Sequence, residues 1–370
     1  MKLSYISNQV IPSKSAESIF VAKSCSSLIS SGYDVLLLCP MRRNFYTNTS
    51  VAENYSIDNI PEIKYFPFPS VKGKYIIYHF FIFLSLLINR PNISYSRTVI
   101  GAFVSYILKI DTILELHSLP RKFSLDGWLF YFLSKKRRLK LLVCISNALK
   151  KDLIDVFKVS ETIMHVEHDA TDIKKPINYE AATNVNFLNL GYVGSLYPGK
   201  GMEIISKLSH LLINKDIIIT VYGGSSSEIQ SWATQCASNV KFMGYTSYAN
   251  IYDVVSTFDV CLLPNQPSVQ CAGHKNGTTD IGKYTSPMKM FDYMAAKKPI
   301  ISSDLPILRE VLDETTAYFA KYDDPQDWLN KVNEIISNNY LAKDKANFAY
   351  NKIVNFYNWD FRVKRIMARF

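Results

Sequence analysis

Residues 187–201, FLNLGYVGSLYPGKG, join a short apolar run to a glycine-rich loop that leads directly into a segment of helix length. Apolar runs of strand length recur after it, each followed by a candidate helix: IIITVYGG (217–224), VKFMGY (240–245), VCLLP (260–264) and PIISSD (299–304). Strands that alternate with helices in this way are typical of a doubly wound parallel sheet. The second half of the chain is therefore predicted to form such a sheet, with the glycine-rich loop after its first strand.

The first half of the chain shows the same alternation. Helix-length segments such as 15–32 and 147–156 separate its apolar runs, which read KLSYIS (2–7), DVLLLC (34–39), TILELH (112–117) and LLVCIS (141–146). The polar stretch 170–186 interrupts the rhythm. We predict an α/β protein with two doubly wound, Rossmann-like domains, 1–172 and 183–354, that face a central cleft. The amphipathic segment 355–370 is predicted to pack back on the first domain.

The composition, with 48% hydrophobic and 20% charged residues, is that of a globular protein. The six cysteines are scattered without a CxxC pair, and the start of the chain lacks the apolar core of a signal peptide. Both observations favour reduced thiols and a cytoplasmic location. A net charge of +10 favours an anionic partner: a membrane face, a phosphorylated small molecule or nucleic acid. Nothing resembles a nucleic-acid recognition module, so no nucleic-acid partner is expected.

The glycine-rich loop is the first candidate for a ligand site. Gly194, Gly199 and Gly201 allow close approach of a ligand to the backbone, and Lys200 brings a cation to the entry of the helix. Bare amides and a cation are what a phosphate group requires. The spacing matches neither the P-loop nor the dinucleotide-binding fingerprint, so an ordinary turn with a solvated lysine remains the alternative.

A second candidate is the stretch SPMKMFDYMAAKKPIISSD at 286–304. Ser286 is a good N-cap and Pro287 suits the first position of a helix, so the amides at this terminus are predicted to face the crevice at the carboxyl ends of the strands. They would form a second anion site.

Asp292 lies on the apolar stripe of that helix, four residues after Met288. A carboxylate that faces the inside of a domain needs a partner. It could accept hydrogen bonds from the hydroxyls of a ribose whose phosphates lie at the helix end. The alternative is an ion pair with Lys289, three residues earlier.

His117 ends the apolar run TILELH at its carboxyl edge, which favours a place on the cleft, although most lone histidines are structural. The segment HVEHDATD offers His165, His168, Asp169 and Asp172 as metal ligands. These residues alternate in direction along a strand and then turn, so no metal site is predicted there.

The chain resembles the GT-B fold glycosyltransferases of family 4, of the kind encoded in bacterial O-antigen and capsule clusters. The resemblance covers nearly the whole chain and is densest from GYVGSLYPGKG (191–201), through VYGG and VKFMGY, to DIGKYTSPMKMFDYMAAKKPIISSDLPILREVL (280–312). The segments ELHSLP, CISNALKKDLI and VEHDATDI of the first half fit the family more loosely.

The resemblance implies that Lys200 and the amides around Ser286 bind the donor diphosphate, that 243–245 pass the base, and that Asp292 replaces the second glutamate of the family's E-x7-E motif. His117 matches a histidine near the donor sugar. The expected catalytic residues are His117, Lys200 and Asp280. The expected donor-binding residues are Gly194, Gly199, Lys200, Met243, Gly244, Tyr245, Lys283, Tyr284, Ser286, Pro287, Met288 and Asp292.

The sequence departs from the family pattern at several of these positions. Tyr284 stands where the first glutamate of E-x7-E belongs, and Asp280 lies four residues earlier. Ser195 stands where family members often carry a basic residue, and Lys283 is the candidate for a second cation.

The resemblance also implies sugar transfer with retention of configuration, without a metal or other cofactor, from a UDP- or GDP-sugar. The apolar run 75–88 is shorter than the roughly 20 residues that cross a bilayer, and 128–140 joins apolar residues to a basic run. We therefore expect a lipid-linked saccharide acceptor and peripheral attachment to an anionic membrane surface, the inner face of the cytoplasmic membrane; a core helix at 75–88 is the alternative. A non-catalytic nucleotide-sugar-binding protein and a nucleotide-sugar epimerase are the rival functions.

Overall fold

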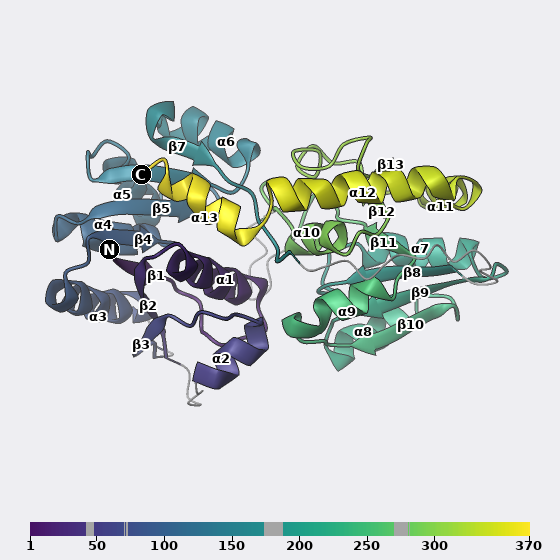
Figure 1. The fold of residues 1–370 in the computed structure, drawn as a ribbon, viewed down its shortest axis with the longest axis horizontal. Helices are drawn as coiled ribbons and strands as arrows, with labels where there is room; N and C mark the ends of the chain where they lie inside the picture. The colour runs from purple at the N-terminus through teal and green to yellow at the C-terminus, as the bar shows by residue number, and fades with distance from the viewer. Residues whose placement is uncertain (42–47, 70, 72, 174–187, 270–279, 281) are drawn as a thin grey trace. The chain divides into compact units, whose positions relative to one another are not determined.

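A computed structural model describes the chain except for residues 42–47, 70, 72, 174–187, 270–279 and 281. The chain forms two compact units (Figure 1). The first comprises Met1–His168 together with Trp359–Phe370, and the second comprises Asp169–Asn358.

The first unit ends earlier than the predicted boundary at 172, because the backbone after His168 bonds within the second unit. The Asp169 N–H donates to Ser286 Oγ at 3.1 Å, and Thr171 Oγ1 donates to Asp292 Oδ1 at 2.7 Å. The returning segment begins at Trp359 rather than at 355.

The first unit contains a parallel seven-stranded sheet of order β3-β2-β1-β4-β5-β6-β7. The strands are β1 (Lys2–Ile6), β2 (Asp34–Pro40), β3 (Glu62–Phe66), β4 (Ile93–Ser96), β5 (Asp111–Leu116), β6 (Leu139–Cys144) and β7 (Met164–Val166). The helices are α1 (Ala16–Ser30), α2 (Asn48–Tyr55), α3 (Lys74–Asn89), α4 (Val99–Ile107), α5 (Leu125–Leu133), α6 (Asn147–Phe157) and α13 (Trp359–Met367). Helix α13, at the end of the chain, packs beside α1 (Figure 1).

The second unit contains a parallel six-stranded sheet of order β10-β9-β8-β11-β12-β13. The strands are β8 (Leu188–Val193), β9 (Ile217–Tyr222), β10 (Val240–Gly244), β11 (Val260–Leu263), β12 (Ile300–Ser303) and β13 (Tyr318–Ala320). The helices are α7 (Met202–Leu211), α8 (Ser226–Ala233), α9 (Ile251–Ser256), α10 (Met288–Ala295), α11 (Pro325–Ser337) and α12 (Asn339–Asn355).

Both sheets confirm the predicted doubly wound, Rossmann-like class. Each apolar run that was read as a strand forms one. Most of these strands are buried on both faces and are therefore continuously hydrophobic in sequence, whereas β10, at the sheet edge, is only half-buried. In each sheet the strand order reverses next to the first strand, between β1 and β4 and between β8 and β11. Ligands of such sheets bind at the carboxyl ends of the strands beside this reversal. In the second unit that position is occupied by the glycine-rich loop after β8.

Helix α3 has features of both predictions for residues 75–88, a core helix and a segment at a membrane surface. One face, with Tyr78, Ile82 and Leu86, is buried in the core, while Ile76 and Ile88 are 75% and 80% exposed. Among the helices of the described residues, none has the length and apolar character needed to cross a membrane.

The described cysteines are free thiols, and most are buried. Burial raises the pKa of the Cys39 and Cys144 thiols, for Cys144 to about 12, so these two sulfurs stay protonated. Cys271 lies outside the described residues.

Candidate functional site

The loop between β8 and α7 needs its glycines for packing. Gly199 and Gly201 have φ of 89° and 109°, a region that other residues rarely adopt. A Cβ on Gly199 would lie 2.3 Å from the carbonyl oxygen of Ser268, and one on Gly201 would lie 2.3 Å from that of Pro264. The loop is therefore pressed against the segment that follows β11, on the other side of the strand-order reversal.

The amides of the three glycines in this loop already have acceptors, which corrects the prediction that they are bare. Gly194 N–H donates to Tyr222 O at 3.0 Å. The Glu203 carboxylate, in the first turn of α7, accepts from Gly199 N–H at 2.8 Å and from Gly201 N–H at 3.2 Å. The positive charge that this loop offers to an anion therefore comes from lysine side chains.

Tyr192, the penultimate residue of β8, supports the same loop from beneath. Its hydroxyl lies 2.8 Å from Ser195 O and 3.1 Å from Lys200 O, so it bridges both ends of the loop. Its ring carries the ammonium of Lys289, which lies 4.1 Å from the ring centroid. Lys200 itself lies with its ammonium 5.4 Å from the ring centroid of Tyr197.

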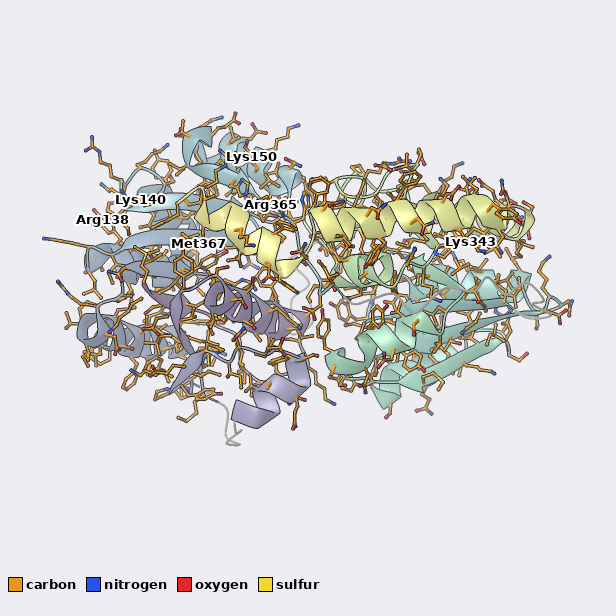
Figure 2. All side chains as sticks on the ribbon, in the orientation of Figure 1. Arg138, Lys140, Lys150, Lys343, Arg365 and Met367 are labelled. Carbon is orange, nitrogen blue, oxygen red and sulfur yellow. The ribbon has the colours of Figure 1, made fainter. Side chains whose placement is uncertain are left out.

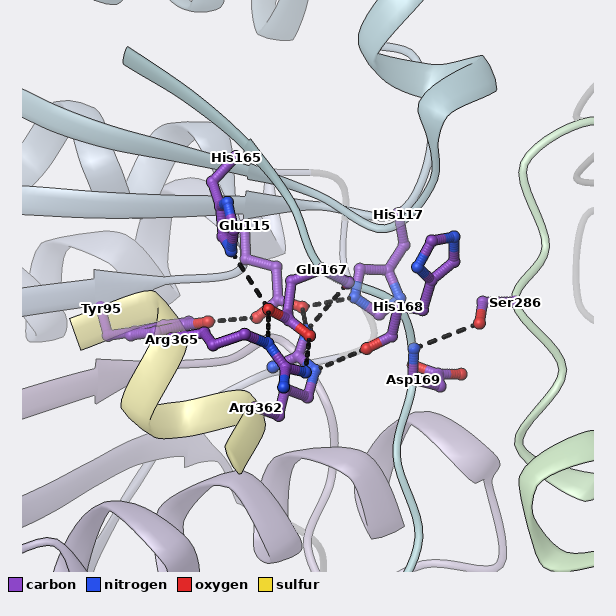
Figure 3. Close-up of polar contacts among 10 residues, drawn as sticks. All are labelled: Tyr95, Glu115, His117, His165, Glu167, His168, Asp169, Ser286, Arg362 and Arg365. Carbon is purple, nitrogen blue, oxygen red and sulfur yellow. Dashed lines mark hydrogen bonds and ion pairs between the residues drawn. The ribbon is translucent and has the colours of Figure 1, made fainter. Parts of the chain in front are cut away.

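Helix α10 begins one residue later than predicted, at Met288, with Pro287 in the cap position. Within the described chain no side chain caps it, because the Ser286 hydroxyl accepts from the Asp169 N–H instead (Figure 3). The predicted Ser286 cap is wrong. The Met290 N–H donates to Pro287 O at 2.9 Å. The amides of Met288 and Lys289 come before it and have no carbonyl of the preceding turn to donate to, as at any helix N-terminus, so they are the ones suited to an anion.

Asp292 is held by two hydroxyl groups. Thr171 Oγ1 donates to its Oδ1 at 2.7 Å, and Tyr248 OH does so at 3.4 Å. Burial first, and then the charge of Asp292, raise the pKa of Tyr248 well above its usual value, so the phenol remains a donor. The alternative ion pair with Lys289 is wrong: among the described residues, Lys289 Nζ has no hydrogen-bond partner.

The residues predicted to pass the base lie at the end of β10. Met243 and Tyr245 are 54% and 51% exposed. Gly244 has φ of 75°, and its carbonyl accepts from Gly223 N–H at 2.7 Å, which fixes the backbone at this edge of the sheet.

Asp280, Lys283 and Tyr284, which precede α10, make contacts with neighbouring residues of their own segment and of the loop after β11. Tyr284, in the place of the family glutamate, is buried, and the ammonium of the exposed Lys283 lies 5.7 Å from its ring centroid. Asp280 Oδ1 accepts from the Val269 and Gly282 N–H groups, each at 2.8 Å. Desolvation opposes its ionisation, but these two bonds lower the pKa of the carboxyl below its usual range. Asp280 is an ionised loop anchor, suited to accept hydrogen bonds and unsuited to donate a proton.

In the first unit, His117 belongs to a buried cluster around Glu115 (Figure 3). Glu115 Oε1 accepts from His117 Nε2 at 2.8 Å and from Arg362 Nη2 at 2.6 Å, and Oε2 accepts from Tyr95 OH at 2.5 Å. Arg362 lies on α13, and its Nε also donates to His168 O at 2.9 Å. The last helix of the chain therefore completes the surroundings of a residue in β5.

The charges in this cluster fix the state of His117. Burial alone would raise the pKa of Glu115, but Arg362 and the hydrogen bond from His117 bring it well below the usual range. Burial, and next the charge of Arg97, lower the pKa of His117 to about 4. His117 is neutral near pH 7, and since Glu115 is an anion, Nε2 must carry the proton. Nδ1 is then left with a lone pair that can accept a hydrogen bond.

The segment HVEHDATD (165–172), for which no metal site was predicted, forms an ion pair and hydrogen bonds with α13. Here Glu167 accepts from Arg365 Nε at 2.9 Å, from Arg365 Nη2 at 2.5 Å and from His165 Nε2 at 3.1 Å (Figure 3). His165, on β7, thus has an acidic partner directly after the end of that strand. Among the described residues no group of His, Cys, Asp and Glu is arranged to hold a metal ion.

Several residues of these sites were not predicted from sequence: Glu115, Arg362, Glu203, Tyr192, Thr171 and Tyr248. Glu115 did leave a signal, since it is an acid within a continuously apolar strand, two residues before His117 and so on the same face. Its partner comes from the other end of the chain, and no local pattern reveals it.

The family model for glycosyl transferases group 1 matches residues 188–338, which lie in the second unit. No curated protein sequence matches the chain significantly.

Solved structures resemble the chain over its whole length. A sucrose-phosphate synthase from Thermosynechococcus elongatus is 14% identical with a TM-score of 0.75, over 99% of this chain and 97% of that one. HepE from Anabaena in complex with UDP-glucose is 14% identical with a TM-score of 0.74, over 100% and 98%. The lipopolysaccharide outer core galactosyltransferase WaaB is 16% identical with a TM-score of 0.67, over 100% and 99%. Residues 188–338 therefore resemble the glycosyl transferases group 1, and the chain as a whole has the GT-B fold.

Proposed function

We propose that this protein is a glycosyltransferase that moves a hexose from a UDP- or GDP-sugar to a saccharide acceptor. The observation that carries the proposal is the position of the match to the glycosyl transferases group 1, which covers the sheet of the second unit. The glycine-rich loop with Lys200 and the N-terminus of α10 lie beside the point where the strand order of this sheet reverses, which is where such sheets bind ligands. The UDP-glucose in the structure of HepE supports a nucleotide-sugar donor.

The proposed transfer retains the anomeric configuration and needs no metal ion. The acceptor oxygen forms a bond to the anomeric carbon on the face from which the bond to the diphosphate oxygen breaks. The proton of the acceptor hydroxyl passes to the departing diphosphate. Lys200 and the amides that begin α10 stabilise the charge that develops there, a role that elsewhere falls to a metal ion.

His117 acts in this scheme as a hydrogen-bond acceptor. Its Nε2–H is held by Glu115, so its Nδ1 can accept from a hydroxyl of the donor sugar and fix the orientation of the ring. A protonated imidazole could not do this, which gives the lowered pKa of His117 a function.

An assay with donor and a membrane-lipid extract tests the proposal. We expect release of free UDP or GDP that depends on the extract, together with a radiolabelled sugar in the lipid fraction. An epimerase would instead convert the donor sugar without the extract, and a non-catalytic binding protein would bind the donor without releasing nucleotide.

We expect Asp292→Ala to weaken the binding of UDP or GDP about tenfold to a hundredfold, because a hydrogen bond to a charged group contributes roughly 1.5–3 kcal/mol. The Asp292 carboxylate is proposed to accept from the ribose hydroxyls in addition to Thr171 and Tyr248. Isothermal titration calorimetry measures the change.

Thr171→Val is the matched control for Asp292, because it removes a protein donor and leaves the carboxylate in place. Its affinity for the nucleotide should equal or exceed that of the wild type. If Asp292→Ala binds as well as the wild type, the carboxylate has a structural role only.

The proposed acceptor is a lipid-linked saccharide of a surface polysaccharide such as O-antigen or capsule, reached by peripheral binding to the cytoplasmic face of the membrane. Exposed apolar side chains on and beside α3 and α5 support this: Ile76, Phe80, Ile88, Phe123, Leu125 and Trp128. Helix α4 packs against both helices. Basic residues follow α5 directly. Two of them, Arg138 and Lys140, both form ion pairs with Asp111 and are labelled in Figure 2. Such a surface suits anionic headgroups.

The membrane proposal predicts that Phe123→Ser with Trp128→Ser reduces binding to vesicles containing phosphatidylglycerol by about a hundredfold or more. These side chains are 90% and 68% exposed, and inserting one large apolar side chain contributes roughly 1.5–3 kcal/mol. Sedimentation at low salt measures it. Tyr340→Ser, at an 84% exposed position of the second unit, is the control and should bind as the wild type does. If the wild-type protein stays in the supernatant, the membrane proposal fails.

A further inference from the structure

Lys289 places a buried amino group beside the glycine-rich loop. It is the second residue of α10, and among the described residues its ammonium nitrogen is buried without a hydrogen-bond partner. It lies 4.1 Å above the ring of Tyr192 and 3.6 Å from the point that a Cβ on Gly194 would occupy. An ammonium can donate three hydrogen bonds, and here it makes none with the described chain.

The position of Lys289 is fixed by the contact of α10 with β8. Val193 N–H donates to Tyr293 OH at 2.8 Å, which joins the strand to the next turn of the helix. Tyr192, next to Val193, carries Lys289 on its ring and holds Ser195 O and Lys200 O with its hydroxyl. The ammonium is therefore directed at the loop that carries Lys200.

No acid compensates this charge in the described structure. Glu203 is engaged with the amides of Gly199 and Gly201, and Asp292 accepts from Thr171 and Tyr248. Burial, and then the charge of Lys200, lower the pKa of Lys289 well below its usual value. The ring of Tyr192 offsets only part of the cost of burying the charge.

We propose that Lys289 is the second cation of the diphosphate site: together with Lys200 and the α10 amides, it binds the diphosphate of the donor. The inference rests on the proposed function and names a residue of the same site. The exposed Lys283, which the sequence offered for this part, lies against Tyr284 instead. An anion between Lys200 and Lys289 would supply hydrogen bonds to the Lys289 ammonium and oppose the repulsion between the two charges.

Lys289→Met keeps an apolar contact with Tyr192 and removes the amino group. A structural role for Lys289 predicts a lower melting temperature for this variant, whereas a binding role predicts weaker binding of the nucleoside diphosphate without a loss of stability. If Lys289 binds the diphosphate, the variant without nucleotide melts at the same or a higher temperature than the wild type, because a buried amino group without a hydrogen-bond partner among the described residues is gone. Its affinity for UDP or GDP, whichever the wild type binds, falls about tenfold or more. Its affinity for the corresponding nucleoside, uridine or guanosine, stays the same.

Proton uptake gives an independent measurement. A nearby anion favours the charged form of a lysine, so nucleoside diphosphate binding should be accompanied by proton uptake at Lys289. Titration calorimetry in two buffers of different ionisation enthalpy detects this uptake in the wild type. We expect it to be absent in Lys289→Met and retained in Lys207→Met, which changes an exposed lysine of α7.

Three results would overturn the inference, and each has a different meaning. If the wild type binds UDP or GDP and Lys289→Met binds it equally well, Lys289 lies outside the site while the proposed function stands. If the variant instead melts well below the wild type and binds nucleoside and nucleoside diphosphate with the same loss, Lys289 is a packing residue. If the wild type binds neither nucleotide, the proposed function itself fails.

Discussion

Arg362→Met is expected to destabilise the protein by about 3–5 kcal/mol, since removing one partner of a buried pair leaves the other charge uncompensated. Arg362 is 1% exposed and Glu115 is 1% exposed, with 2.6 Å between Arg362 Nη2 and Glu115 Oε1. The same side chain holds His168 O, so its loss also frees the backbone at the end of the first unit. Urea unfolding followed by circular dichroism measures the change in the free energy of unfolding.

Arg365→Met is the matched control on the same helix. Arg365 pairs with Glu167, but the Arg365 side chain is 35% exposed, so water screens the pair, and Glu167 keeps its hydrogen bond to His165 when Arg365 is replaced. We expect a clearly smaller loss. Combining Arg362→Met with Glu115→Gln should recover much of the stability, because the uncompensated carboxylate is then removed. A loss below about 1 kcal/mol in Arg362→Met would contradict a structural role for the pair.

The same pair gives the stability a pH dependence of definite sign. The pKa of Glu115 is lower in the folded protein than in the unfolded chain. Its contribution is therefore present above the unfolded value, about 4.3, and is lost as the pH falls toward the folded value. Glu115→Gln should flatten this acid limb of the stability curve.

The elements that could be predicted from sequence are those whose burial is local and complete. Strands β8, β9 and β11 are continuous apolar runs, and their order in the sheet follows from the doubly wound rule. Strand β3, EIKYF, was missed because it is only half-buried at the sheet edge and mixes polar with apolar residues. Strand β4 was missed because its buried serines, Ser94 and Ser96, gave no apolar run.

The sequence located the loops that form the site, but it did not reveal the hydrogen-bond partners of their residues. The spacing of glycines and Lys200 located the loop after β8, but the acceptor of its amides, Glu203, was read as an ordinary helix residue. Ser286 has the composition of a helix cap, yet its hydroxyl binds the backbone of Asp169, 117 residues earlier. Contacts between residues so far apart in sequence depend on the tertiary packing of the unit, and local sequence patterns carry no information on that packing.

His117→Asn is expected to lower kcat about a hundredfold to a thousandfold, the scale on which one well-placed polar group near a developing charge acts. Asparagine is too short to keep both the bond to Glu115 and a lone pair where Nδ1 lies. Steady-state kinetics with the donor that the protein binds, and circular dichroism to confirm folding, measure the effect. A loss of less than about threefold would place His117 among structural histidines.

The pH dependence of the same reaction separates orientation by His117 from proton transfer. An acceptor must be neutral, and burial and Arg97 lower the pKa of His117 to about 4. In the wild type we therefore expect kcat/KM to show no limb from His117 between about pH 5 and 8, where an ordinary histidine titrates. Arg97→Leu removes the cation and should move the acid limb of kcat/KM upward toward pH 6.5. Glu115→Gln removes the charge that favours protonation, so its limb should not rise. A wild-type alkaline limb near pH 6.5, with kcat/KM lost as the pH rises, would mean that His117 is protonated in turnover, and the neutral acceptor would have to be abandoned for a general acid.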